Sequence, residues 1–72
     1  MFQKELGELL ARAVTSLSPL LRSVLLLREV DELSTHQTAL TLGISEQAVK
    51  ARLFRARLRL RQKLARWWIQ QP

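Results

Sequence analysis

The sequence has 72 residues, a formal net charge of +6 and no cysteine. A chain of this length forms one small domain that buries only about 60% of the surface of its extended form. The lack of cysteine excludes a disulfide framework and a thiolate metal site, so a reducing, cytoplasmic setting fits best. The longest aliphatic run, Val24 to Leu27, is far shorter than the roughly 20 residues that cross a bilayer. We therefore expect no membrane span, and no basic and apolar leader pattern indicates a cleavable secretory signal.

The charge is distributed unevenly along the chain. Residues 1–43 contain four basic residues (one lysine and three arginines) and five acidic residues, which gives a net charge of −1. Residues 44–72 hold eight lysines and arginines and only one acid, Glu46, a net charge of +7. This asymmetry indicates a polyanionic partner for the C-terminal part, most simply nucleic acid, with an anionic membrane surface as the competitor.

Two helices are predicted in the N-terminal half. Apolar residues recur mainly at steps of three and four from residue 2 to 17, which predicts a helix from about residue 3 to 16. Ser18 can cap a second helix, and Pro19 is tolerated at its first position, so this helix should run from residue 19 to about 29. Its apolar residues cover most of its circumference, and we expect it to be the most buried element. The apolar residues are Phe2, Leu6, Leu9, Leu10, Ala13, Val14 and Leu17 in the first segment, and Leu20, Leu21, Val24, Leu25, Leu26 and Leu27 in the second.

Capping signals predict a third helix from about residue 35 to 42. Ser34 and Gln37 fit a capping box, in which each side chain satisfies the backbone donor of the other residue. Gly43 can adopt the left-handed conformation that ends a helix, and Ser45 can cap a fourth helix from residue 46. Two helices joined by so short a turn indicate a helix-turn-helix. The predicted fold is therefore all-α, a single four-helix domain over residues 1–72 with a long C-terminal recognition helix.

The stretch from Arg52 to Arg61 alternates arginine with apolar residues, as a strand would. Over a longer range the apolar residues recur at steps of four, three, four, four and three, which is a helical pattern. Arginine, leucine and alanine are also strong helix formers. We therefore predict one helix from residue 46 to 69, with a core side formed by Val49, Leu53, Ala56, Leu60, Leu64 and Trp67.

The opposite side of this helix carries the candidate functional residues. In a helix-turn-helix, the N-terminal part of the second helix enters the major groove, where side chains reach base edges. Gln47 can pair with adenine, Lys50 or Arg55 with guanine, and Phe54 can pack on a thymine methyl. The two capped helix N-termini are candidate phosphate contacts. The predicted DNA-binding residues are Ser34, Ser45, Gln47, Lys50, Ala51, Arg52, Phe54, Arg55 and Arg57.

The alternative is that this basic face is merely solvated, which would be our choice for an arbitrary run of charge. Here the run follows a capped helix, a glycine turn and a second capped helix, and these features favour DNA binding. An exposed Phe54 among cations is also hard to explain by solubility alone.

Several motifs occur in order between Leu17 and Arg57 and together extend over more than half of the chain. They include Val24 to Arg28, Leu33-Ser34, Leu42 to Ser45 and Val49 to Arg57. In these motifs the chain resembles region four of extracytoplasmic-function sigma factors. The resemblance implies a four-helix domain that binds the minus-thirty-five promoter element and contacts the flap of the RNA polymerase β subunit. It also implies that an anti-sigma factor can mask this surface. We expect no enzymatic activity and no cofactor.

The chain departs from the family pattern in three respects. Two prolines commonly open the second helix, and here Ser18 replaces the first of them, which should alter only the helix start. Thr38 stands where a larger aliphatic residue is usual, which should loosen the packing between the two motif helices. The sigma domain that melts promoters is absent, so we expect an excised domain that does not initiate transcription alone.

The remaining candidates are weaker. His36 is the one histidine in the sequence, and an exposed helix position is a better interpretation than a metal ligand or a catalytic base. Asp31 and Glu32 precede a capped helix and should be solvated. Trp67 continues the core side, whereas Trp68 can either contact a partner or lie exposed near the end of the chain.

Two other functions stay open. A sigma-like fold can act as a protein-interaction domain that binds a regulator without reading DNA, using the tryptophans and the leucine-rich first helices. A basic amphipathic helix can also bind a membrane surface.

By Arg59 the last helix has risen about 20 Å from its start. We therefore expect Lys50 and Arg55 to dominate promoter recognition, while Arg59, Arg61 and Arg66 serve phosphates, protein partners or solubility.

Overall fold

Residues 2–69, which the computed structural model describes, form four α-helices and contain no strand: α1 (Phe2–Thr15), α2 (Pro19–Glu29), α3 (Thr35–Leu42) and α4 (Glu46–Ile69). The all-α fold predicted from the sequence is therefore confirmed. The first helix begins and ends one residue earlier than the sequence pattern suggests. None of the helices among the described residues combines the length and the apolar character needed to span a membrane.

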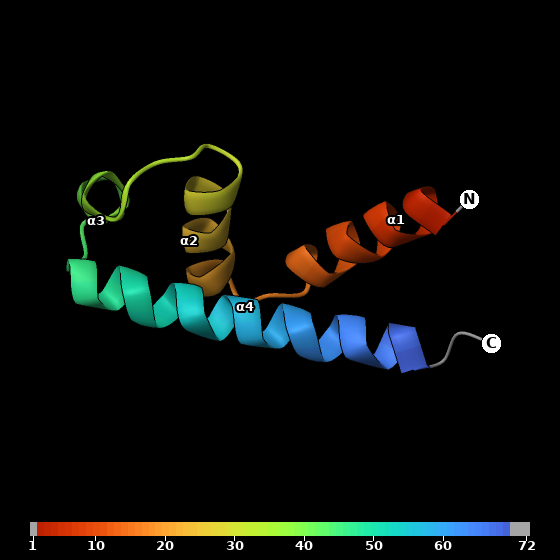
Figure 1. Cartoon of the computed structure of the whole chain (residues 1–72). Helices are drawn as coiled ribbons and strands as arrows, with labels where there is room; N and C mark the ends of the chain where they lie inside the picture. The colour runs from red at the N-terminus through yellow and green to blue at the C-terminus, as the bar shows by residue number, and fades with distance from the viewer. Residues whose placement is uncertain (1, 70–72) are drawn as a thin grey trace.

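The long helix α4 is the base on which the other three helices lie (Figure 1). The short helix α3 sits over the N-terminal end of α4, α2 meets α4 at a steep angle, and α1 extends on the side of the C-terminal half of α4. The result is elongated, with principal extents of 44 × 18 × 16 Å. One end of α4 thus belongs to the helix-turn-helix, and its other end lies toward both chain termini.

Each helix after the first begins directly after a serine that the sequence marks as a cap. The Ser18 hydroxyl accepts a hydrogen bond from the Leu21 amide at the start of α2, and Pro19 occupies the first turn. Arg22 closes the end of α1 by donating hydrogen bonds to the carbonyls of Thr15 at 3.0 Å and Leu17 at 3.4 Å. The connection between α1 and α2 is therefore fixed by polar contacts as well as by packing.

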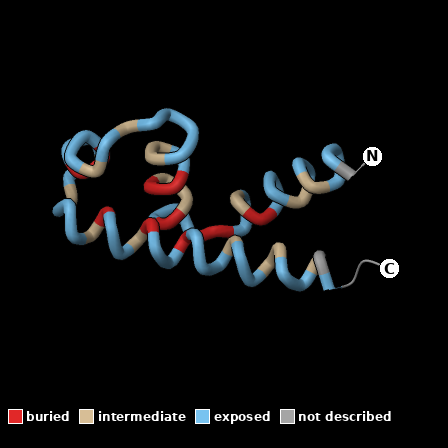
Figure 2. Tube along the Cα trace, in the orientation of Figure 1, coloured by how far each residue is buried: buried red, intermediate tan, exposed pale blue. Residues whose placement is uncertain are grey.

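The buried core gathers where α2, α3 and α4 meet, and it is coloured red in Figure 2. Val24 of α2 and Val49 of α4 are both fully buried in this core. The carbon atoms removed from water supply the main driving force for folding, at about 25 cal/mol per Å². The core cluster consists of Leu17, Leu21, Val24, Leu25, Ala39, Val49, Leu53 and Ala56.

The second helix is less buried than its composition suggests. Leu21, Val24 and Leu25 are buried, but Leu20 is 59% exposed and Leu26 is 38% exposed. As the sequence predicts, α2 has the largest share of buried residues among the described helices, but its apolar residues are not buried on every side. A domain of 72 residues has too few neighbouring elements to cover every side of one helix.

The first helix buries only its C-terminal part. Ala13 is buried, Leu6 and Leu9 are half-buried, and Leu10 is exposed. The side chain of Phe2, which the sequence pattern assigned to the apolar face, lies outside the described residues. The N-terminal turns of α1 therefore offer apolar surface rather than contributing to the core.

Candidate nucleic-acid interface

The turn between α3 and α4 has the geometry that a helix-turn-helix requires. Gly43 adopts the left-handed conformation with φ 67°, and its N–H donates to the Ala39 carbonyl. The Ile44 amide donates to the same carbonyl at 3.1 Å, which completes the closure of α3. Ser45 then accepts a hydrogen bond from the Ala48 amide at 3.0 Å and so caps α4. This confirms the predicted caps and fixes where the exposed first turns of α4 begin.

The start of α3 carries the predicted capping box. The Gln37 amide donates to the Ser34 hydroxyl at 3.0 Å, and the Ser34 amide donates to the Gln37 side-chain oxygen at 2.9 Å. Both Ser34 and Ser45 are exposed. The positive ends of two helix dipoles therefore open to solvent, one at the start of each motif helix.

The first turns of α4 present one exposed face. It is formed by side chains that the helical spacing predicts to lie opposite the core, and Phe54 among them is 68% exposed. Arg52 is half-buried at the border of this face. We define the outward face of α4 as Gln47, Lys50, Ala51, Phe54 and Arg55, all of which are exposed.

A groove of about 350 Å³ runs beside this face, where α4 lies against α2 and the start of α3. Its walls combine four cationic side chains with three apolar ones, so it suits a ligand that is anionic and partly apolar. We refer to it as the basic groove, and it is lined by Arg28, Thr35, Lys50, Leu53, Phe54, Arg57, Leu58 and Arg61.

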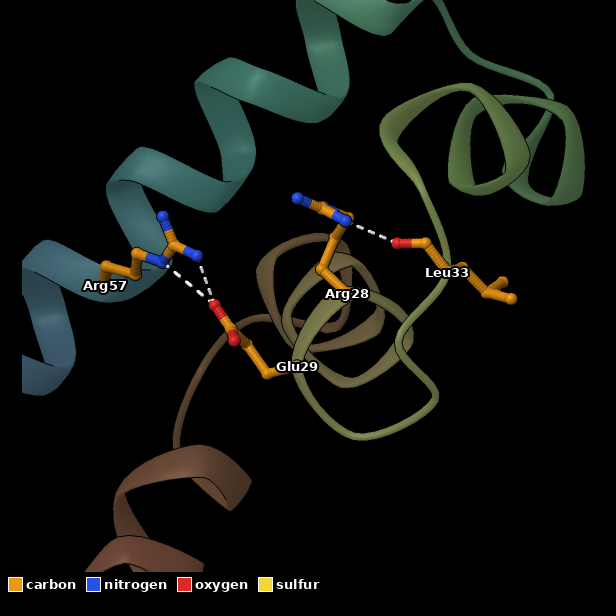
Figure 3. A network of polar contacts seen from close by, with 4 residues as sticks. All are labelled: Arg28, Glu29, Leu33 and Arg57. Atoms are coloured by element: carbon orange, nitrogen blue, oxygen red, sulfur yellow. Dashed lines mark hydrogen bonds and ion pairs between the residues drawn. The ribbon is translucent and has the colours of Figure 1, made fainter.

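Arg57 of the basic groove already has a partner within the chain. Its Nε donates to Glu29 Oε1 at 3.0 Å, and its Nη2 donates to the same oxygen (Figure 3). Glu29 is the last residue of α2, so the ion pair joins the end of α2 to the middle of α4. Arg57, which the sequence suggested for DNA binding, therefore differs from Lys50 and Arg55 in being held by a carboxylate.

Arg28 is a second cation of the basic groove with a partner inside the chain, and the sequence did not predict this contact. It is half-buried and donates a hydrogen bond to the Leu33 carbonyl in the loop before α3 (Figure 3). Its Nε is buried without a hydrogen-bond partner among the described residues. The side chain thus ties the end of α2 to the entry of α3 at one wall of the basic groove.

His36 is exposed on α3, as the sequence indicates, and its Nδ1 lies 3.3 Å from Glu46 Oε2 in the first turn of α4. Asp31 and Glu32 are also exposed, as expected. Within residues 2–69, no three histidine, cysteine, aspartate or glutamate side chains are grouped to hold a metal ion.

The cations beyond Arg57 fall into two groups. Lys63 donates a hydrogen bond to the Ser16 hydroxyl and so connects α4 to the turn after α1. Arg59, Arg61 and Arg66 are exposed. A second groove, of about 310 Å³, lies between α1 and this part of α4 and is lined by Leu9, Arg12, Ala13, Ser16, Lys63 and Arg66.

Of the two tryptophans near the C-terminal end, the structure describes the side chain of Trp67 alone. Trp67 is half-buried, in line with its place on the core side. The side chain of Trp68 lies outside the described residues, so both alternatives for it, contact with a partner and exposure, stay predictions.

Glu29 and Arg28 are the residues near the interface that sequence reasoning missed. A carboxylate at the last position of a helix is unfavourable for the helix dipole, and that conflict was the available signal that Glu29 has a nearby cation. No comparable signal exists for Arg28, because its partner is a backbone carbonyl.

The sequence is similar to that of known proteins. Residues 7–60 match the family described as "Sigma-70, region 4". The chain is similar to proteins named RNA polymerase sigma-E factor: 46% identical over 56 residues to that of Streptomyces antibioticus and 45% identical over 56 residues to that of Streptomyces coelicolor. Each match covers 78% of this chain but only 31% and 32% of the two relatives. The chain thus spans about a third of the length of these relatives. No solved structure was found to match it.

Proposed function

The chain belongs to the sigma-70 region 4 family, and we propose that it binds the minus-thirty-five promoter element as part of a sigma factor that directs bacterial RNA polymerase to promoters. The observation that carries this proposal is the outward face of α4, which begins directly after the glycine turn. Polar and cationic side chains in the first turns of the second motif helix are the ones that reach base edges in the major groove.

Each residue of the outward face has a proposed role. Gln47 is suited to an adenine edge, and Lys50 and Arg55 are suited to guanine. Ala51 and Phe54 offer apolar contact to thymine methyl groups. These assignments agree with the exposure of all five side chains.

The phosphate contacts are proposed for the two helix N-termini and for the cations that border the outward face. At the start of α3 the amides of Ser34 and Gln37 are already used in the capping box, so a phosphate there would meet the amides of Thr35 and His36. Ser45 offers the corresponding position at the start of α4. Arg52 and Arg57 complete the set as phosphate contacts that position the helix without specifying sequence.

The protein partners are proposals of the same kind. The family relationship favours the flap of the RNA polymerase β subunit as one partner and an anti-sigma factor as a regulator. The second groove, between α1 and the C-terminal half of α4, has apolar and cationic walls and is distant in sequence from the outward face. An acidic, partly apolar protein segment would complement these walls.

The setting follows from these proposals. A chain that acts with RNA polymerase works in the bacterial cytoplasm. The promoter-melting domain of a full sigma factor is proposed to lie in the part of the relatives that this chain does not match. We accordingly expect the 72 residues alone not to start transcription.

Selection from a randomised duplex library tests the proposal, and it does not require the promoter sequence to be chosen in advance. The purified domain should enrich one short motif, and a duplex with that motif should bind more tightly than a scrambled duplex of the same composition. Binding should weaken as salt rises, with a slope of about −0.9 per phosphate contacted.

The competing function is a protein-interaction domain that binds a regulator without reading DNA. The exposed leucines of α1 and α2, Leu10 and Leu20, are the observation in its favour. Enrichment of no motif, together with salt-independent binding to a regulator, would support this second function and contradict the first.

A further inference from the structure

The ion pair between Glu29 and Arg57 contributes little to stability. The two side chains are 46% and 50% exposed, and exposed pairs of this kind typically contribute about 0–1 kcal/mol. Its larger consequence is the orientation of Arg57, because both the Nε and Nη2 donors point at one oxygen of Glu29. That geometry turns the guanidinium toward the end of α2.

Arg57 also belongs to the basic groove, where it lies on the same side of α4 as Lys50. The two residues are seven positions apart, which is about two helical turns, so their side chains project in nearly the same direction. A phosphate bound along the basic groove near Lys50 would therefore lie close to Arg57 and also to the carboxylate of Glu29.

Carboxylate and phosphate oxygens compete for the same donors. The guanidinium fork binds either group through paired N–H···O hydrogen bonds. Glu29 occupies the Nε donor and one Nη2 donor of Arg57. A phosphate can therefore bind through this edge of the guanidinium only by displacing Glu29, and the nearby carboxylate would repel the phosphate. The Glu29 carboxylate thus occupies donors of Arg57 that a DNA phosphate could use.

We propose that Glu29 is a positioning residue for DNA binding: it holds Arg57 at the end of α2 in the free protein, and a DNA phosphate replaces it when a duplex binds. This inference rests on the proposed function and adds a residue that weakens DNA affinity. Phosphate contacts carry no sequence information, so Glu29 lowers affinity for matched and scrambled duplexes alike and leaves sequence preference to the outward face of α4.

The test compares the whole 72-residue chain with Glu29→Gln, Arg57→Ala and the double variant. Asp31→Asn serves as the matched control, because Asp31 is an exposed carboxylate two residues after Glu29, just beyond the end of α2. Its neutralisation changes the net charge by the same amount. Fluorescence anisotropy measures binding to the selected and to the scrambled duplex over a series of potassium chloride concentrations. Circular dichroism checks that each variant keeps its helical content.

Glu29→Gln should bind both duplexes about two- to fivefold more tightly than Asp31→Asn at low salt. The gain should shrink as salt rises, because screening weakens the internal pair in the unsubstituted chain. Arg57→Ala should reduce the salt slope by about 0.9, the value of one phosphate contact. When Arg57 is already replaced by alanine, Glu29→Gln should increase the affinity for either duplex by no more than Asp31→Asn does.

Three results would overturn the proposal. If the unsubstituted chain binds neither duplex, the proposed function fails and the exchange fails with it. If that chain binds but Glu29→Gln matches Asp31→Asn, only the exchange fails. An equal gain from Glu29→Gln with and without Arg57 would show that Glu29 acts through net charge rather than through Arg57.

Discussion

Arg28 in α2 donates a hydrogen bond to the backbone carbonyl of Leu33, which immediately precedes the capping box of α3 (Figure 3). The contact holds the loop between α2 and α3, and so helps to position α3 against α4. Arg28→Met keeps the aliphatic stem but removes the donor, and it should lower the free energy of unfolding by about 1–2 kcal/mol. Urea denaturation measures the change.

The matched control for this substitution is Arg59→Met on the exposed side of α4. Surface substitutions of this kind usually change stability by less than about 0.5 kcal/mol. Equal stabilities for the two variants would contradict a structural role for Arg28.

Thr38 is fully buried in α3, and its hydroxyl has no hydrogen-bond partner among the described residues. Thr38→Val replaces that hydroxyl by a methyl group of similar size. Because a buried unpaired hydroxyl costs about 1–3 kcal/mol, we expect the substitution to raise the free energy of unfolding by about 1 kcal/mol. Thermal and urea denaturation both report this change.

Thr41→Val is the control for Thr38→Val within the same helix. Thr41 is exposed and its hydroxyl donates to the Gln37 carbonyl at 2.8 Å, so this substitution removes a satisfied group and should give no stabilisation. A loss of stability in Thr38→Val would contradict the unpaired burial of its hydroxyl.

The two glycines should respond oppositely to one substitution. A Cβ at either position meets nothing within 4 Å, but Gly43 has φ +67° and Gly7 lies within α1. Gly43→Ala should destabilise the domain by about 1 kcal/mol, because a side chain disfavours the left-handed conformation. Gly7→Ala should stabilise it by about 0.5–1 kcal/mol, since alanine is the better helix former.

Thermal denaturation of both glycine variants gives the comparison directly. The melting temperature should fall for Gly43→Ala and rise for Gly7→Ala. A rise for both would contradict the left-handed closure of α3 on which the helix-turn-helix geometry depends.

The helix starts and the turn could be predicted from the sequence because their determinants are local. A serine cap, a capping box and a glycine closure each act within about four residues, and Ser34, Gln37, Gly43 and Ser45 all make the predicted contacts. The outward face of α4 followed in the same way, because helical periodicity alone separates Phe54 and Arg55 from the core side of the helix.

Contacts between distant segments could not be predicted in this way. The pairing of Glu29 with Arg57 spans 28 positions and depends on the angle at which α2 meets α4. The exposure of Leu20 depends on how many helices a small domain can place around α2. A composition rich in leucine indicates that the helix is buried but not which of its sides has a neighbour, so the exposure of Leu20 could not be predicted.

We propose that the first turns of α4 recognise the promoter sequence and that the later cations do not. Arg55 and Arg61 are both exposed arginines of α4 and lie six positions apart, so Arg55→Ala and Arg61→Ala form a matched pair. The decisive measurement is the ratio of affinities for the selected and the scrambled duplex at fixed salt. We predict that Arg55→Ala reduces the discrimination by about 1–3 kcal/mol and that Arg61→Ala leaves the ratio unchanged. Loss of discrimination in Arg61→Ala with full discrimination in Arg55→Ala would contradict the account.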